Sequence, residues 1–241
     1  MKAPPRRAAF YDVGSGTGGL RDWLTLLHPP YTLWHLSYVA IGAAVVPHLV
    51  LWRLGGTLLA FFLAVGVGAH ALDELNGRPL GTGISSAALK VAAAVSIGAA
   101  MVAGVACGGL RLLPFVVAGG LFVFGYNLEL LGGVLHNDLG FAATWGAFPV
   151  LVGAYAQHWT LPPAAWVAAV AALLLSLGQR SLSTPARTLR RKVALASVRI
   201  TYSDDSQREL GRADLLAPLE RALRAFAWAV SALAVALVLA R

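Results

Sequence analysis

The sequence predicts an all-α, polytopic helical membrane protein with about seven transmembrane helices. Of its 241 residues, 58% are hydrophobic and only 12% are charged, whereas a soluble domain carries about 25% charged residues. The mean hydropathy is +0.69, and apolar runs of spanning length recur along the chain. The single cysteine, Cys107, excludes an intrachain disulfide.

The apolar runs define four segments of the chain. A cytosolic leader (1–26) precedes a helical bundle (27–179), and a basic cytosolic segment (180–221) precedes a C-terminal transmembrane helix (222–241). Most runs have the roughly 17–25 residues that a helix needs to cross the hydrocarbon core. The runs are Tyr31–Trp52, Gly55–Leu72, Ser86–Gly108, Leu112–Leu131, Leu139–Ala156, Pro162–Leu177 and Ala222–Ala240.

The leader contains YDVGSGTGGL, residues 11–20, which has the acid and glycine spacing of an S-adenosylmethionine loop. Such a loop needs a buried strand before the glycines and alternating strands and helices after them. Here PPRRAAF precedes the glycines, and the short amphipathic stretch RDWLTLLHPP follows them before the membrane begins. We therefore expect a flexible cytosolic leader rather than a nucleotide-binding loop.

The distribution of charge predicts the orientation in the cytoplasmic membrane. With seven spans and a cytoplasmic N-terminus, 16 of the 19 Lys and Arg residues fall inside, and only Arg53, Arg111 and Arg241 fall outside. The net charge of +8 then reports this asymmetry and indicates membrane lipid, not nucleic acid, as the partner. All eleven acids also fall on the inner side.

The end of the second run carries the first cluster of chemical groups, in GAHALDELNGRPLGTGIS, residues 68–85. Asp73, Glu74 and Asn76 offer oxygen ligands of the kind that Mg²⁺ takes beside substrate phosphates. His70 shares a helix face with the two acids, and Arg78 is suited to phosphate. The cluster predicts a site for a diphosphate and a metal at the inner membrane surface.

Two further acids of the bundle, Glu129 and Asp138, also lie near the inner ends of spans. Carboxylates at membrane depth are costly, so they usually face a cavity and mark function. We therefore expect one site on the cytoplasmic side that is shared by these acids and the first cluster.

Several stretches resemble the UbiA superfamily of intramembrane prenyltransferases. RPLGTGIS (78–85) is similar to the segment after the family's first aspartate-rich motif, and LHPPYTLWHLSYVAIGAAV (27–45) is similar to its first helix. YNLELLGGVLHNDLGFAATWGAFPVLVGA (126–154) is similar to its mid-chain stretch. The resemblance covers roughly residues 27–157.

The resemblance implies transfer of an isoprenoid chain from a prenyl diphosphate to a lipid-soluble acceptor. It implies Mg²⁺ held by Asp73 and Glu74, which act in catalysis together with Asp138. The remaining residues that it places around the substrate are His70, Asn76, Arg78, Lys90, Tyr126, Asn127, Glu129 and His136.

Two alternatives stay open at this stage. The segment after the sixth run, LGQRSLSTPARTLRRKV, has no acid where the family has its second aspartate-rich motif. A non-catalytic protein on the same scaffold, which binds an isoprenoid or a partner, is therefore the first alternative. The second is a metalloenzyme with Zn or Fe bound by His35, His70 and His136 together with the inner-side carboxylates.

The basic segment predicts three local structures. Ser183 or Thr184 before Pro185 has the pattern of a helix start, and the helix that follows would anchor the chain, lie near anionic lipid or reach toward the diphosphate. Residues 197–210 alternate and then turn, which predicts a short hairpin. GRADLLAPLERALRAF is amphipathic and leads into the last span.

Overall fold

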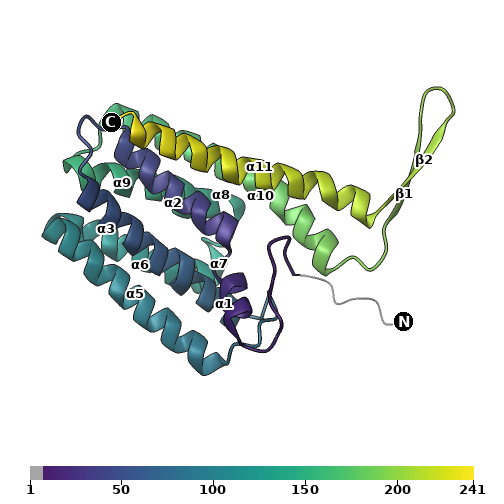
Figure 1. Cartoon of the computed structure of the whole chain (residues 1–241), viewed down its shortest axis with the longest axis horizontal. Helices are drawn as coiled ribbons and strands as arrows, with labels where there is room; N and C mark the ends of the chain where they lie inside the picture. Colours follow the sequence, from purple (N-terminus) through teal and green to yellow (C-terminus); the bar gives the residue numbers. More distant parts are fainter. Residues whose placement is uncertain (1–7) are drawn as a thin grey trace.

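A computed structural model describes residues 8–241, apart from the side chain of Leu131, and is mostly helical (Figure 1). Lys2, Arg6 and Arg7 of the leader lie outside the described residues. The α-helices are α1 (Leu20–Leu26), α2 (Pro29–Ala44), α3 (Leu51–Phe61), α4 (His70–Leu75), α5 (Ser86–Gly108), α6 (Leu113–Asn127), α7 (Leu130–Gly133), α8 (Asp138–Phe141), α9 (Phe148–His158), α10 (Pro163–Arg191) and α11 (Arg212–Leu239). Two π-helical segments, Phe62–Ala69 and Ala142–Ala147, join α3 to α4 and α8 to α9, and a 3-10 turn, Gly109–Leu112, joins α5 to α6.

Five helical stretches within residues 8–241 are long and apolar enough to cross a membrane, so the chain has the character of a membrane protein. They are Leu51–Leu75, Ser86–Asn127, Asp138–His158, Pro163–Arg191 and Arg212–Leu239. The predicted count of seven is not confirmed by this measure. Two features account for the difference, because α2 has only 16 residues and the 42-residue stretch contains both α5 and α6.

The first predicted run, Tyr31–Trp52, is divided between two helices. Helix α2 ends at Ala44, and α3 begins at Leu51. Pro47 lies between them, and a proline has no backbone N–H and disfavours helical geometry in the residue before it. The apolar pattern of the run therefore continues through a turn.

Helices α2 and α9 approach each other closely at two glycines. A Cβ atom on Gly42 would collide with the backbone of Val150, and one on Gly153 would collide with the backbone of Val39. Small residues at such a contact let helix backbones pack directly in lipid. Around this pair, a buried cluster that includes Trp34 joins α2 and α9 to α10 and α11.

Helix α10 continues beyond the predicted run and into the basic segment. It reaches Arg191, and Pro185 lies inside it, so the predicted helix start at Ser183 or Thr184 is wrong. The proline removes one backbone hydrogen bond. Helix α10 nevertheless packs along α11 on both sides of it, through a shared apolar cluster before Pro185 and the Arg190–Glu220 pair after it. The basic residues up to Arg191 therefore lie on a helix that is continuous with the bundle, and Arg199 and Arg208 lie in the hairpin.

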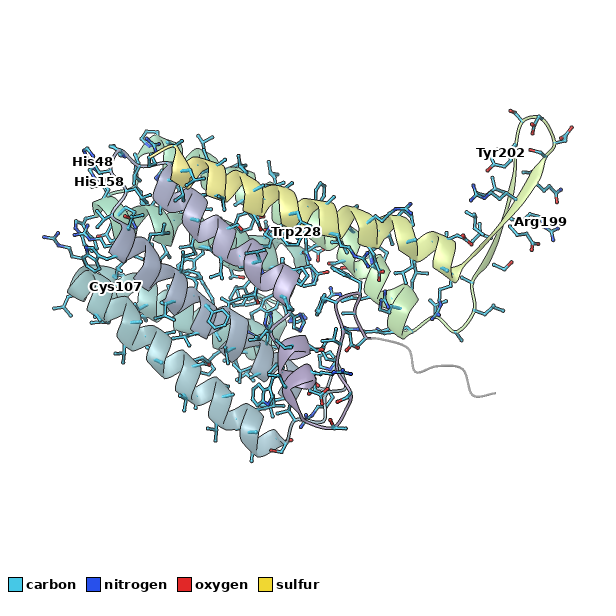
Figure 2. The ribbon with its side chains drawn as sticks, in the orientation of Figure 1. His48, Cys107, His158, Arg199, Tyr202 and Trp228 are labelled. Carbon is cyan, nitrogen blue, oxygen red and sulfur yellow. The ribbon has the colours of Figure 1, made fainter. Side chains whose placement is uncertain are left out.

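The hairpin prediction is confirmed. Strands β1 (Ser197–Thr201) and β2 (Gln207–Gly211) pair antiparallel, with Ser197 opposite Gly211. The hairpin extends away from the bundle and carries Arg199 and Tyr202 (Figure 2). The amphipathic stretch after it forms the first part of α11, which runs on without a break into the last apolar run.

Candidate functional site

A polar cavity of about 280 Å³ lies where α2 begins, among α4, α6, α10, α11 and the leader. It brings together titratable groups that are far apart in sequence. From the predicted site it collects Asp73, His70, Tyr126, Asn127 and His136. The other lining residues with polar side chains are Tyr11, His28, Tyr31, His35, Gln179, Arg180, Ser183, Arg187, Arg190, Arg191 and Glu220.

The positive charge of the cavity comes from one face of α10. Arg180, Arg187 and Arg191 are seven and four residues apart, which places them on the same side of the helix. Arg180 pairs with Asp138 at 2.8 Å between Nε and Oδ1, and Arg190 pairs with Glu220. Arg187 makes no ion pair within residues 8–241, although it lines the cavity. The face is therefore richer in positive than in negative charge and suits an anion.

Asp73 is the predicted acid that lines the cavity. Its carboxylate accepts no hydrogen bond from the residues that the structure describes, and Arg187 and Arg191 are near enough for their charges to act on it. It is available to a ligand or a cation. Mg²⁺ is commonly held by one or two carboxylates together with substrate phosphates, so Asp73 fits this role only when a phosphate ligand supplies further oxygens.

Glu74 does not line the polar cavity; its carboxylate instead holds the loop of residues 80–82. Its side chain is fully buried. The carboxylate accepts hydrogen bonds from the backbone N–H groups of Leu80 and Thr82 at 2.9 and 2.8 Å, and from the Thr82 hydroxyl at 2.8 Å. These contacts fix the glycine-containing loop that follows Arg78. The metal role that the sequence predicts for Glu74 therefore competes with three hydrogen bonds.

The remaining predicted residues do not line the cavity. Arg78 donates to the Ile84 carbonyl at 2.6 Å and to the Ser86 hydroxyl at 2.7 Å, so it also belongs to the loop. Lys90 and Glu129 are exposed. The remaining two, Asn76 and Asp138, make contacts with the Asn127 carbonyl and with Arg180, respectively.

Three of the histidines at the cavity have the same tautomer. The Nδ1 atoms of His35, His70 and His136 lie 2.8, 3.1 and 3.2 Å from the backbone carbonyls of Trp145, Gly66 and Tyr126. A carbonyl only accepts, so each Nδ1 carries the proton and each Nε2 is an acceptor in the neutral ring. Residues 8–241 contain no group of three His, Cys, Asp or Glu side chains arranged for a metal ion, and the Zn or Fe alternative gains no support from geometry.

The glycine stretch of the leader is not the flexible segment that the sequence predicts, because it is folded around a carboxylate of the chain itself. Asp22 is fully buried and accepts hydrogen bonds from the backbone N–H groups of Ser15, Gly16 and Gly18 and from that of Gly83. Burial by itself raises the pKa of Asp22, but these four hydrogen bonds lower it and the net shift is downward. The N–H groups that would face a bound anion in a nucleotide loop are thus directed at Asp22.

Replacement of Asp22 with asparagine is expected to release this part of the leader. Loss of the charged acceptor should raise hydrogen exchange at Ser15, Gly16 and Gly18 by about tenfold or more. Because the folded-state pKa is lowered, docking is fully stabilised above the ordinary carboxyl pKa and weakens as pH falls through the lowered value. Exchange measured by mass spectrometry at several pH values tests both statements. Asp204→Asn in the exposed hairpin is the control, and equal exchange in Asp22→Asn and wild type would contradict this role.

The docked leader closes one side of the cavity with Tyr11. Its hydroxyl lies 2.6 Å from Nδ1 of His28, and the His28 ring stacks on that of His70 at a centroid distance of 4.1 Å. Burial raises the pKa of Tyr11 well above its usual range. Burial, assisted by the neighbouring His70, lowers the pKa of His28 well below its usual range. Both side chains are therefore neutral near neutral pH.

An apolar cavity of about 80 Å³ lies deeper in the bundle, among α3, α5, α6 and α9. Val65 and Trp145 line both this cavity and the polar one. Each belongs to one of the two π-helical segments, a type of helix that is rare and is frequently found at functional sites. The polar and apolar cavities thus share a wall. His48 and His158, in contrast, lie at the far end of the bundle from the hairpin (Figure 2).

The sequence does not predict that Tyr11, His28, Tyr31 and Gln179 line this cavity, and it does not single out Arg187. The sequence does contain evidence for Arg187, because its spacing from Arg180 and Arg191 places the three on one helix face once α10 is recognised as continuous.

No protein-family model, curated protein or solved structure matches the chain, so the similarity to the UbiA superfamily remains a prediction.

Proposed function

We propose that the chain is a UbiA-like intramembrane enzyme that transfers an isoprenoid chain from a prenyl diphosphate to a lipid-soluble acceptor. The observation that carries the proposal is the wall shared by the two cavities at Val65 and Trp145. A molecule with an anionic head and an apolar chain fits this pair, with its head beside the arginines of α10 and its chain toward the deeper cavity. The polar cavity alone would not hold the apolar chain, and the apolar cavity alone offers no positive charge to the head.

The fold that accompanies this proposal has seven crossings. They are α2, α3 with α4, α5, α6, α8 with α9, α10 and α11. In this arrangement the polar cavity lies on the cytoplasmic side of the cytoplasmic membrane, together with the N-terminus, because the Arg-rich end of α10 is on that side.

The reaction needs the charge of a leaving diphosphate to be offset. The bond between C1 of the prenyl group and the diphosphate oxygen breaks, and its electron pair leaves with the diphosphate. The acceptor donates an electron pair to C1 and loses a proton, for which Nε2 of His70 is an acceptor. Arg187 and Arg191 stabilise the departing anion. Mg²⁺, when held by Asp73 and the phosphates, would make the diphosphate a better leaving group.

A second candidate is a non-catalytic protein that binds the same class of lipid. It is favoured by one observation: the carboxylate of Glu74 is engaged by the loop, which leaves Asp73 as the predicted metal ligand at the cavity. Such a protein would bind the diphosphate through arginines and would need no metal.

Thermal stabilisation of the detergent-purified protein tests the proposal. Farnesyl or geranylgeranyl diphosphate should raise Tm, since a ligand that binds only the folded state stabilises it by about 2.7 kcal/mol at 100 times its Kd. Farnesol and inorganic pyrophosphate, which carry the two halves of the ligand separately, should each give a smaller shift. No shift with any prenyl diphosphate, in protein shown to be folded, would refute lipid diphosphate binding.

Addition of Mg²⁺ distinguishes the two candidates. The enzyme predicts a further stabilisation that Asp73→Asn loses, together with release of diphosphate when the acceptor is present. The binding protein predicts the same shift with and without Mg²⁺ and no release of diphosphate.

A further inference from the structure

The backbone of His28 has a conformation that histidine rarely adopts. Its φ and ψ are 46° and 56°, in the left-handed region, at the residue that precedes α2. For a residue with a Cβ atom this conformation costs about 1–2 kcal/mol, and such strain tends to persist at functional sites. Glycine or asparagine would relieve it. The strain makes the side chain of His28 a candidate for a function, which its contacts must then support.

The partner of His28 determines which ring nitrogen carries the proton. If the Tyr11 hydroxyl donates to Nδ1, the hydroxyl is satisfied and Nε2 carries a hydrogen. If Nδ1 donates to the phenol oxygen, the Tyr11 O–H hydrogen and the Nε2 lone pair both lack a partner among the described residues. The first arrangement leaves fewer polar atoms unsatisfied and is the more stable. His28 thus has the tautomer opposite to that of His35, His70 and His136.

The Nε2–H group of His28 is a buried donor without an acceptor among residues 8–241. Nε2 is shielded from water and has no hydrogen-bond partner among the residues that the structure describes. A donor left in this state costs about 1–3 kcal/mol, so buried groups of this kind need an explanation. His28 lines the polar cavity beside the arginines of α10. Nε2 itself has no surface open to the cavity, so a turn of the His28 ring that points Nε2–H inward would let an anionic oxygen there supply the missing acceptor.

We propose that His28 binds the anionic headgroup of the ligand through Nε2–H, and that Tyr11 is a positioning residue that sets the required tautomer. This inference rests on the proposed lipid diphosphate site and adds to it two residues of the N-terminal region. It also assigns a role to the leader, because the fold around Asp22 places Tyr11 against the cavity. The leader is therefore part of the ligand site.

A double-mutant cycle on the affinity for farnesyl diphosphate tests the role of Tyr11. Tyr11→Phe should weaken binding about tenfold, the loss of one hydrogen bond to a charged group. His28→Gln has an amide N–H near the position of Nε2 and no tautomer to set, so it should bind within about threefold of wild type. In the His28→Gln background, Tyr11→Phe should then have no further effect. Tyr155→Phe, outside the polar cavity, is the matched control.

Equal losses from Tyr11→Phe in both backgrounds would overturn the tautomer role and leave the lipid site standing. Absence of binding by folded wild type would overturn both this inference and the proposed function. His28→Asn separates the backbone from the side chain: asparagine tolerates the left-handed conformation but is too short to place a donor at Nε2. It should fold as well as wild type and lose about tenfold in affinity. Wild-type affinity in His28→Asn would overturn the donor role.

The tautomer itself is measurable without a ligand. In protein labelled with ¹⁵N-histidine, the nitrogen chemical shifts of His28 should report a neutral ring protonated at Nε2. Tyr11→Phe should shift the ring toward a mixture of the two tautomers, whereas Tyr155→Phe should leave it unchanged. A His28 ring protonated at Nδ1 in the wild type would overturn the proposal.

Discussion

Glu74→Ala is expected to lower the stability of the ligand-free, metal-free protein by about 3 kcal/mol or more. The substitution leaves the N–H groups of Leu80 and Thr82 without their acceptor, and hydrogen bonds to a charged group contribute about 1.5–3 kcal/mol each, although not additively. For a chain of this size the expected fall in Tm is about 10 °C. Thermal unfolding in detergent with a chelator present measures it.

The control is an acid whose contacts are exposed. Glu209 pairs with Arg199 in the hairpin, with 65% of each side chain exposed, and Glu209→Ala should change stability by less than about 1 kcal/mol. If Glu74 instead served as a metal ligand, Glu74→Ala would leave the metal-free Tm unchanged and remove only a stabilisation by Mg²⁺. That result would restore the role implied by the family resemblance and contradict the loop role.

Neighbouring positions on one helix explain why Asp73 lines the polar cavity and Glu74 does not. Charge asymmetry and the ends of the apolar runs bring His70, Asp73, Tyr126 and His136 to one end of the bundle, and the cavity does contain them. Consecutive side chains of a helix, however, are about 100° apart. Asp73 and Glu74 therefore face different surroundings, and only the fold of the loop after Arg78 shows which side is the cavity.

The leader marks the limit of prediction from local pattern. Its glycines have a sequence signal, but their partner Asp22 also binds Gly83, 61 residues further along the chain. No periodicity reports a contact of this kind, so the sequence does not predict that Tyr11 and His28 line the polar cavity. Pro185 is a second case in which a local sequence pattern does not determine the structure. A local rule predicts a helix start there, and packing of α10 against α11 overrides it.

Arg187→Gln is expected to change stability and ligand binding in opposite directions. Arg187 lacks an ion pair among the described residues, and its charge is disfavoured first by burial and then by the like charges of Arg180 and Arg191. Removing its charge relieves this repulsion, so the ligand-free Tm should be equal to that of wild type or a few degrees higher. Affinity for farnesyl diphosphate should fall by about 10- to 100-fold, as expected for loss of one charged contact with phosphate.

A substitution that raises Tm but lowers ligand affinity identifies a binding residue rather than a structural one. Residues that serve ligand binding often lower the stability of the ligand-free protein. Arg221→Gln on the exposed face of α11 removes the same charge away from the cavity and should alter neither quantity. Titration of each variant with farnesyl diphosphate at two salt concentrations, beside thermal unfolding without ligand, gives both measurements. A lower Tm with unchanged affinity would make Arg187 a packing residue and would move the anion away from the arginine face of α10.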